Sequence, residues 1–236
     1  MSITTDIITI LYGDSKDLDR LRASIEENCR DYNLIVWDNN KENIGYTRAA
    51  NAATAMGTAP YVWHLNQDAI VLPGSQEALI KRLESHPKVG MSGSMQIDYD
   101  NHDLIRHSGT SRAFPGGVHK GGYISMGHGR FPEKQTWLNY ASVMLKREMV
   151  NDVGPMDETM FLVYSDSDYA YMCRSKGWEV WYEPQSRVYH KLGASRNTTE
   201  WHQKDMQAFM KKWGIQVHPN GTYTVGPEFA KLDKFP

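Results

Sequence analysis

The stretch at residues 61–68, YVWHLNQD, decides the fold of this chain. It opens with a run that is apolar or aromatic apart from His64, a composition typical of a strand buried on both faces. The polar residues Asn66, Gln67 and Asp68 then end the strand. In an open parallel sheet the carboxyl ends of the strands line the ligand site, so these three residues are the first candidates for function.

Two earlier runs repeat the pattern. Residues 6–11 (DIITIL) form a predicted strand that ends at Tyr12, and residues 34–37 (LIVW) form another that stops at Asp38. Apolar residues at helical spacing lie between the three strands, around residues 18–29 and 46–56. Strands that alternate with helices predict parallel pairing with right-handed crossovers. We therefore expect a three-layer α/β fold with a mostly parallel central sheet, extended by a strand at residues 89–95.

The rest of the chain is less regular. Residues 97–136 lose the pattern and are predicted to be a long loop. Residues 116–130 within it are rich in glycine and histidine and could fold over a ligand or simply be mobile; the sequence does not give their role. Strands follow at residues 141–145, 178–182 and 187–190. Helices are expected at residues 166–176 and from Thr198 or Thr199 to Gly214. We expect one domain over residues 1–215 and a C-terminal extension over residues 216–236, with a hairpin at Asn220-Gly221.

Composition excludes several classes of protein. The 236 residues include 28 acidic and 26 basic ones, without the basic excess that nucleic-acid binding needs. Only two cysteines are present, which is too few for a disulfide framework and agrees with a reducing cytoplasm. Residues 1–10 do not resemble a secretory signal, and no apolar run reaches the roughly 18 to 20 residues of a membrane span. We expect a cytoplasmic protein with no nucleic-acid partner and no membrane span.

The polar strand ends offer a donor site. Asp68, which we expect at an exposed strand end, could hold Mg²⁺ or Mn²⁺ against phosphates, and Asp38 could accept hydrogen bonds from a base or a ribose. Taken alone, each is more simply explained as an ordinary turn residue. Gly45 could open a helix whose first amides and Arg48 face a diphosphate, or it could be a loop glycine beside a solvated arginine.

Three residues in the second half are candidates for chemistry. Asp166 and Asp168 begin a predicted helix, where they could simply cap it. The helix N-terminus also favours an ionised carboxylate, and an ionised carboxylate in a cleft can serve as a general base. His190 follows a strand, where it could be structural or a metal ligand.

Together these segments resemble the family 2 glycosyltransferases of the GT-A fold, and within them the rhamnosyltransferase-like branch. The resemblance extends over residues 5–215 and lies in motifs that follow one another in the family's order. These are Asp38-Asn39, Glu42 to Asn51, His64 to Asp68 with Pro73-Gly74-Ser75, Leu145 to Glu148, Gly154 to Glu158, Asp166-Ser167-Asp168, Lys176-Gly177-Trp178 and Val188-Tyr189-His190.

The resemblance implies an inverting transfer of a sugar from a nucleotide-diphosphate sugar of UDP or dTDP type to a hydroxyl of a glycan or other acceptor. It implies that Asp38 contacts the nucleoside, that Asn66 and Asp68 stand at the metal motif, that Asp166 is the base and that His190 is a further ligand of Mn²⁺ or Mg²⁺. We add to the donor-binding residues Tyr12, Asn43, Gly45, Arg48 and Asn66, and we assign Trp137 and Asp168 to the acceptor side.

The chain departs from the family pattern in places. Ser165 stands where the family has an acidic residue, and Asn66 leaves the metal motif one charge short. A nucleotidyltransferase shares the sheet architecture but calls for a glycine-rich basic loop after the first strand, which residues 12–15 (YGDS) do not supply. A nucleotide-sugar binder without transfer activity is the other alternative. The sugar, nucleobase, acceptor and oligomeric state are not given by the sequence.

Overall fold

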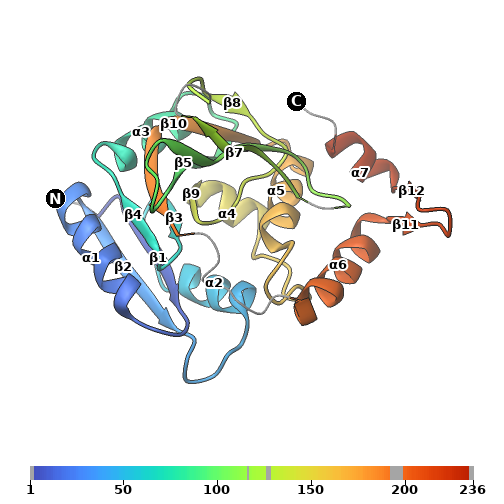
Figure 1. Ribbon diagram of the computed structural model, residues 1–236, viewed down its shortest axis with the longest axis horizontal. Helices are drawn as coiled ribbons and strands as arrows, with labels where there is room; N and C mark the ends of the chain where they lie inside the picture. Colours follow the sequence, from blue (N-terminus) through green and yellow to red (C-terminus); the bar gives the residue numbers. More distant parts are fainter. Residues whose placement is uncertain (1–2, 116, 126–128, 192–198, 234–236) are drawn as a thin grey trace.

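A ten-stranded sheet forms the middle layer of the structure, a computed structural model that describes residues 3–115, 117–125, 129–191 and 199–233 (Figure 1). Its strands are β1 (Thr5–Leu11), β2 (Tyr32–Asp38), β3 (Tyr61–Leu65), β4 (Ala69–Val71), β5 (Val89–Asp98), β6 (Leu104–Arg112), β7 (Val118–Ser125), β8 (Glu133–Lys134), β9 (Ser142–Lys146) and β10 (Glu179–His190). Seven of them follow the order β2-β1-β3-β9-β5-β10-β4, while β6, β7 and β8 lie off this path.

Most strands of that path run in one direction. β1 pairs in parallel with β2 and β3, and β5 pairs in parallel with β10. β9 is antiparallel to both β3 and β5, so the two parallel groups share one direction, and β4 is antiparallel to β10. Only β9 and β4 therefore oppose the other five strands of the path. The expected α/β fold with a mostly parallel sheet is confirmed.

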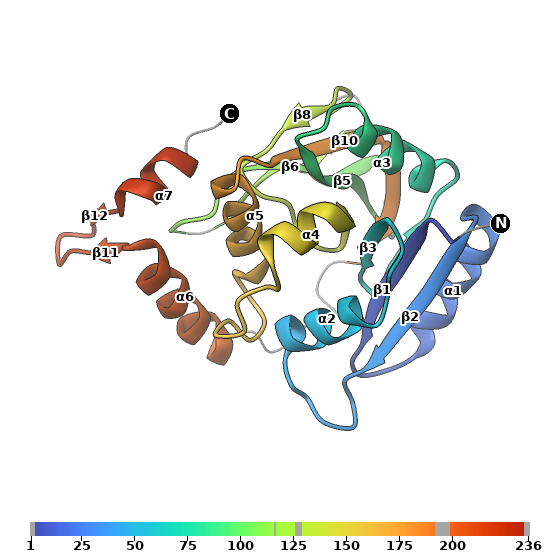
Figure 2. The ribbon, with the colours of Figure 1, turned by 180° about the vertical axis from the view of Figure 1, so that it is seen from behind.

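Helices cover the sheet on both faces (Figure 2). Successive side chains of β1 point to opposite faces and both are apolar, so each face needs a cover. Ile7 packs with α1 (Lys16–Asn28) and α3 (Ser75–Glu84). Ile8 packs on the other face, where α2 (Tyr46–Ala55), α4 (Arg147–Val153) and α5 (Ser165–Ser175) lie. The middle of the sheet is thereby closed to water, and the polar residues that stand there, such as Thr9, His64 and Ser92, are buried.

The C-terminal residues share the core of the domain. α6 (Thr199–Trp213) leads into a hairpin of β11 (Gln216–Val217) and β12 (Tyr223–Thr224), followed by α7 (Pro227–Leu232), at one end of the molecule (Figure 1). Phe229 of α7 is 1% exposed and its ring lies 5.1 Å from that of Tyr171 in α5 and 5.8 Å from that of Phe209 in α6. The residues after 215 thus complete a hydrophobic core that α5 and α6 leave open.

The predicted loop at residues 97–136 is wrong in its larger part. β6 and β7 form an antiparallel pair there, and β6 also pairs with the end of β5. Register shifts recur along this pair, at residues 105–107, 107–110 and 110–112. Each shift breaks the alternation of inward and outward side chains, which is why no strand period is visible in the sequence. Residues 116 and 126–128 of the glycine- and histidine-rich segment lie outside the described residues.

Other boundaries differ in smaller ways. The strands expected at residues 178–182 and 187–190 are one strand, β10, with a register shift between Glu183 and Arg187. The short strand β4 directly follows Asp68 and was not predicted. None of the helices in the described ranges is both long and apolar enough to cross a membrane.

Replacing Phe229 with alanine should lower the free energy of unfolding by about 3–5 kcal/mol, the usual loss when a buried aromatic ring is removed. Urea unfolding followed by tryptophan fluorescence measures it. Phe131→Ala is the control, since Phe131 is 81% exposed, and it should change stability by no more than about 0.5 kcal/mol. Equal effects of the two changes would contradict the shared core.

Candidate active site

Side chains join the loops that follow the first three strands of the sheet. The backbone N–H of Tyr12 donates to Oε1 of Gln67 at 2.8 Å, and Nε2 of Gln67 donates to the Tyr12 carbonyl at 3.0 Å. The N–H of Gly13 donates to Oδ1 of Asn40 at 2.7 Å. The carboxyl ends of β1, β2 and β3 therefore form one connected edge.

Tyr12 and Asp38 are accessible on this edge. Tyr12 is 58% exposed although it is a large aromatic residue, so its ring offers a surface on which a flat base could stack. Asp38 is also exposed, and its Oδ1 accepts the N–H of Asn40 at 3.0 Å. The carboxylate forms the predicted Asx turn and still has acceptor positions open to a ligand.

The loop before α2 is built by asparagine side chains. Oδ1 of Asn43 accepts the Gly45 N–H at 3.1 Å and an amide hydrogen of Asn39 at 3.0 Å. Gly45 has φ of +86°, and a Cβ there would lie 2.6 Å from the ring of Phe161. Asn43 and Gly45 thus shape the loop, and only glycine fits at position 45.

The start of α2 is occupied in part by other groups of the protein. The N–H of Thr47 donates to the Phe161 carbonyl at 3.3 Å. Arg48 pairs with Glu158 at 3.5 Å, with both side chains exposed. One amide at the start of α2 is therefore taken by the protein, whereas an exposed ion pair holds Arg48 only weakly, and its role at a diphosphate stays a prediction.

Three predicted residues converge beyond the end of β3. Oδ1 of Asp68 lies 3.3 Å from Nε2 of His190, and Nδ2 of Asn66 lies 3.4 Å from the same nitrogen. The antiparallel pairing of β4 and β10 causes this, because it places His190 opposite Ala69, the residue after Asp68. Asp68 is 7% and His190 6% exposed, so the strand end expected to be exposed is buried. We call Asn66, Asp68 and His190 the edge triad.

The edge triad fits a divalent cation in its donor types. A carboxylate, an imidazole and an amide carbonyl are ligands that suit Mn²⁺, and the carboxylate and carbonyl also suit Mg²⁺. Nδ1 of His190 is buried and has no hydrogen-bond partner among the described residues. No group of three or more His, Cys, Asp and Glu in the described ranges is arranged to hold a metal. The third protein donor would accordingly be Asn66, which is neutral.

Asp166 is the second residue of α5 and not its cap. The cap position belongs to Tyr164, which has φ of +64°. Oδ1 of Asp166 accepts the Ser167 N–H at 2.7 Å. Burial raises the pKa of Asp166 to about 6, against the opposing effect of this backbone hydrogen bond. Desolvation thus outweighs the helix amides in setting the pKa of this carboxylate, which is still below neutral pH.

Three tyrosines lie within electrostatic reach of Asp166. Burial, with the charge of Asp166 as a smaller contributor, raises the pKa of Tyr46, Tyr140 and Tyr164. Tyr46 begins α2, Tyr164 precedes α5, and Tyr140 lies next to Ala141, whose carbonyl accepts the Asn66 N–H at 3.0 Å. The chain at residues 140–141 thus connects the surroundings of Asp166 with the edge triad.

The two residues predicted on the acceptor side are both buried. Asp168 is 0% exposed and accepts hydrogen bonds from Nζ of Lys212 at 2.7 Å and Nε1 of Trp213 at 2.8 Å. Trp137 is 4% exposed and lies beneath Gly117, where an added Cβ would come within 2.8 Å of its ring. Asp168 ties α5 to α6 and Trp137 belongs to the core, so neither geometry supports a contact with an acceptor.

Several residues of the site were missed. Gln67 stands inside the motif at residues 66–68. No sequence pattern indicates that the side chain of a glutamine forms hydrogen bonds with a different loop. Asn39 is 3% exposed in the structure. Its place directly after Asp38, at the end of a strand, was the signal in the sequence that could have indicated it. Asp205 has three backbone partners far away in sequence, at residues 161–163, and no local pattern indicates it.

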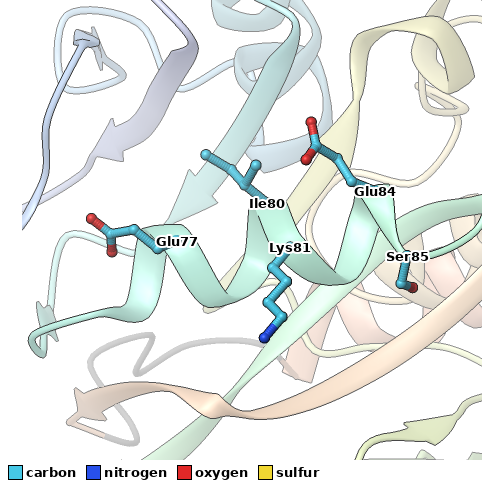
Figure 3. A pocket seen from close by; sticks show the side chains of 5 residues that line it. All are labelled: Glu77, Ile80, Lys81, Glu84 and Ser85. Atoms are coloured by element: carbon cyan, nitrogen blue, oxygen red, sulfur yellow. The ribbon is translucent and has the colours of Figure 1, made fainter.

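A surface groove lies elsewhere, along the outer side of α3 (Figure 3). Glu77, Ile80, Lys81, Glu84 and Ser85 line it, and all five come from α3 and the residue that follows it. It contains none of the candidate residues, and we assign it no part in the chemistry.

The sequence model of glycosyl transferase family 2 matches residues 2–151. The chain belongs to this family. A curated relative, the amylovoran biosynthesis glycosyltransferase AmsE of Erwinia amylovora, is 37% identical over 66 residues, which is 28% of this chain and a quarter of that protein.

Solved structures confirm the GT-A fold. The structure of GalNAc-T7 with UDP, GalNAc and Mn²⁺ has a TM-score of 0.69 at 12% identity, over 88% of this chain and 48% of that one. The mannosyltransferase PcManGT of Pyrobaculum calidifontis, with GDP-Man and Mn²⁺, has a TM-score of 0.62 at 14% identity, over 99% and 68%. At these identities the likeness concerns the fold.

The raised pKa of Asp166 predicts a pH dependence of stability. A carboxyl group has a pKa near 3.9 in an unfolded chain, so the folded state binds its proton more tightly. Its contribution is favourable below about pH 4 and is lost as the pH rises through about 6. Asp166→Asn, which keeps the oxygen that accepts the Ser167 N–H, should therefore have a Tm at pH 8 equal to or above that of the wild type. Thermal unfolding from pH 4 to 8 tests this, and a variant clearly less stable at pH 8 would contradict the burial of the charge.

Proposed function

We propose that this chain is an inverting, metal-dependent glycosyltransferase that moves a sugar from a UDP- or dTDP-type donor to a hydroxyl of a glycan or other acceptor. The donor type follows its resemblance to the rhamnosyltransferase-like branch. The observation that supports the proposal most directly is the edge triad, in which Asp68 and Asn66 lie 3.3 and 3.4 Å from Nε2 of His190.

The donor would lie across the connected strand ends. Tyr12 is exposed for stacking on the base, and Asp38 has acceptor positions for base or ribose hydroxyls. The diphosphate would then reach the edge triad, whose cation neutralises the charge of the departing diphosphate when bound. GalNAc-T7 with UDP and PcManGT with GDP-Man both contain Mn²⁺, which supports this arrangement.

Asp166 is the proposed base. The acceptor oxygen forms a bond to the anomeric carbon as the bond from that carbon to the diphosphate breaks, and the diphosphate leaves with the electron pair. The acceptor proton passes to a carboxylate oxygen of Asp166. A single displacement of this kind inverts the anomeric configuration. A pKa of about 6 leaves Asp166 ionised at neutral pH and close to the working pH, where a general base is most effective.

Asp166→Asn should lower turnover by about 10²- to 10⁴-fold, the usual contribution of a general base. Affinity for the nucleoside diphosphate with Mn²⁺ should stay near that of the wild type. Release of nucleoside diphosphate, with UDP- and dTDP-sugars and a panel of mono- and oligosaccharide acceptors, measures turnover. The matched control is Asp17→Asn, because Asp17 is likewise the second residue of a helix, α1, and this change should leave turnover intact. Full turnover in Asp166→Asn would reject Asp166 as the base, and donor binding without transfer in the wild type would favour a binding protein.

Asp68→Asn should remove most of the strengthening that Mn²⁺ gives to nucleoside-diphosphate binding, a loss of about tenfold or more in affinity, or roughly 1.4 kcal/mol. Calorimetric titration of UDP and dTDP with and without Mn²⁺ measures this. Asp38→Asn serves as the contrast, since it should weaken binding by about 1–3 kcal/mol to the same extent with and without the metal. An undiminished Mn²⁺ effect in Asp68→Asn would rule out the edge triad as the cation site.

A further inference from the structure

One buried carboxylate holds the segment that leads to Asp166. Residues 156–164, here called the base-approach segment, connect α4 to α5. Asp205 of α6 is 1% exposed, and its carboxylate accepts the N–H of Phe161 at 2.9 Å and those of Leu162 and Val163 at 2.8 Å each. Three backbone donors on one carboxylate fix both the place and the orientation of three consecutive peptide groups.

The opposite side of the base-approach segment contacts α2. The side-chain amide of Asn51 exchanges two hydrogen bonds of 2.9 Å with the backbone of Met156. The Phe161 carbonyl accepts the Thr47 N–H, and its ring packs on Gly45. The segment is thus held between α2 and Asp205 on α6. α2 lies beside the connected carboxyl ends of β1, β2 and β3, which we call the donor edge.

The need for such anchoring is visible at Tyr164. This residue follows the three anchored peptides and has φ of +64°, a conformation that a residue with a side chain adopts at a cost of about 1–3 kcal/mol unless its surroundings hold it. Asp166 comes two residues later. The direction in which α5 starts, and with it the position of the Asp166 carboxylate, depends on this turn.

We propose that Asp205 is a positioning residue for the catalytic base: its carboxylate sets the backbone of residues 161–163 and thereby places Asp166 against the acceptor. This inference rests on the proposed role of Asp166. Attachment of α6 alone does not require Asp205, because Asp168 binds Lys212 and Trp213 of α6 and the ring of Phe209 packs in the core.

Asp205→Asn tests the proposal. The amide keeps one acceptor oxygen but turns the other into a donor that faces a backbone N–H, so the base-approach segment should shift. We expect kcat to fall by about 10- to 100-fold, the effect of a displacement on the order of 1 Å. The KM for the donor and the affinity for nucleoside diphosphate with Mn²⁺ should remain within about twofold, because the donor edge is untouched.

The pH profile gives a second readout. Asp166 is faced by Tyr46 from α2, Tyr140 before β9 and Tyr164 before α5. If the segment shifts, Asp166 should become more exposed to water, and the acid limb of kcat, which we expect near pH 6 in the wild type, should move to lower pH. A role of Asp205 in stability alone would leave the limb in place.

Asp6→Asn is the matched control. Asp6 is 2% exposed, accepts the Ala59 N–H at 2.7 Å and pairs with Arg147 at 2.8 Å, near the end of β1 opposite to the donor edge. Asp6→Asn should lower Tm at least as much as Asp205→Asn does, without a change in kcat or in the acid limb of its pH profile. Asp205→Glu keeps the charge and moves the oxygens by one methylene, so it should cause a smaller loss of kcat at unchanged affinity, and it carries the test if Asp205→Asn does not fold.

The outcomes separate the two proposals. Turnover that survives in Asp166→Asn rejects the base, and the role of Asp205 with it. Loss of turnover in Asp166→Asn together with wild-type kcat in Asp205→Asn rejects the positioning role alone. A loss of kcat in Asp205→Asn no larger than in Asp6→Asn, or a parallel loss of donor affinity, also overturns it.

Discussion

The burial of the sheet on both faces is the constraint on which the rest of this structure depends. Ile7 and Ile8 are neighbours on β1, yet each is almost fully buried in a different cluster. Polar groups in the middle of such strands would lose their contacts with water and be costly. The candidate residues therefore lie at the strand ends, as in the edge triad, and in the first turn of a helix, as Asp166 does in α5.

The two antiparallel strands of the main path determine which residues meet at the edge. β4 turns back directly after Asp68 and pairs with the end of β10, so that a residue more than a hundred positions later in the sequence reaches the carboxylate. β9 enters between β3 and β5, and just before it the Ala141 carbonyl accepts the Asn66 N–H while Tyr140 lies within electrostatic reach of Asp166. A purely parallel sheet would not bring these groups together in this way.

The sequence was sufficient to predict an element where the spacing of its apolar residues matches the residues that the fold buries. The strands ending at Leu11, Asp38 and Leu65 could be read from their apolar runs, and the resemblance to a known family supplied the pairing of Asp68 with His190. It was insufficient where the decisive contact joins distant segments. Nothing near Asp168 shows that Lys212 and Trp213 occupy its carboxylate. The bulges in β6 and β7 remove the alternation that would have revealed two strands. The desolvation that raises the pKa of Asp166 depends on what packs around it in the folded chain, which no local pattern contains.

The amide of Gln67 extends the hydrogen-bonding of the sheet beyond its last residues. By donating to and accepting from the backbone of Tyr12, it acts as one more rung between the loops after β1 and β3. Conformational entropy that a free loop would lose on binding a ligand is already lost during folding. Tyr12 is thus preorganised, and more of the attraction between its ring and a base appears as affinity. Glutamate would fill the same volume but lacks the donor for the Tyr12 carbonyl, so shape alone does not make position 67 interchangeable.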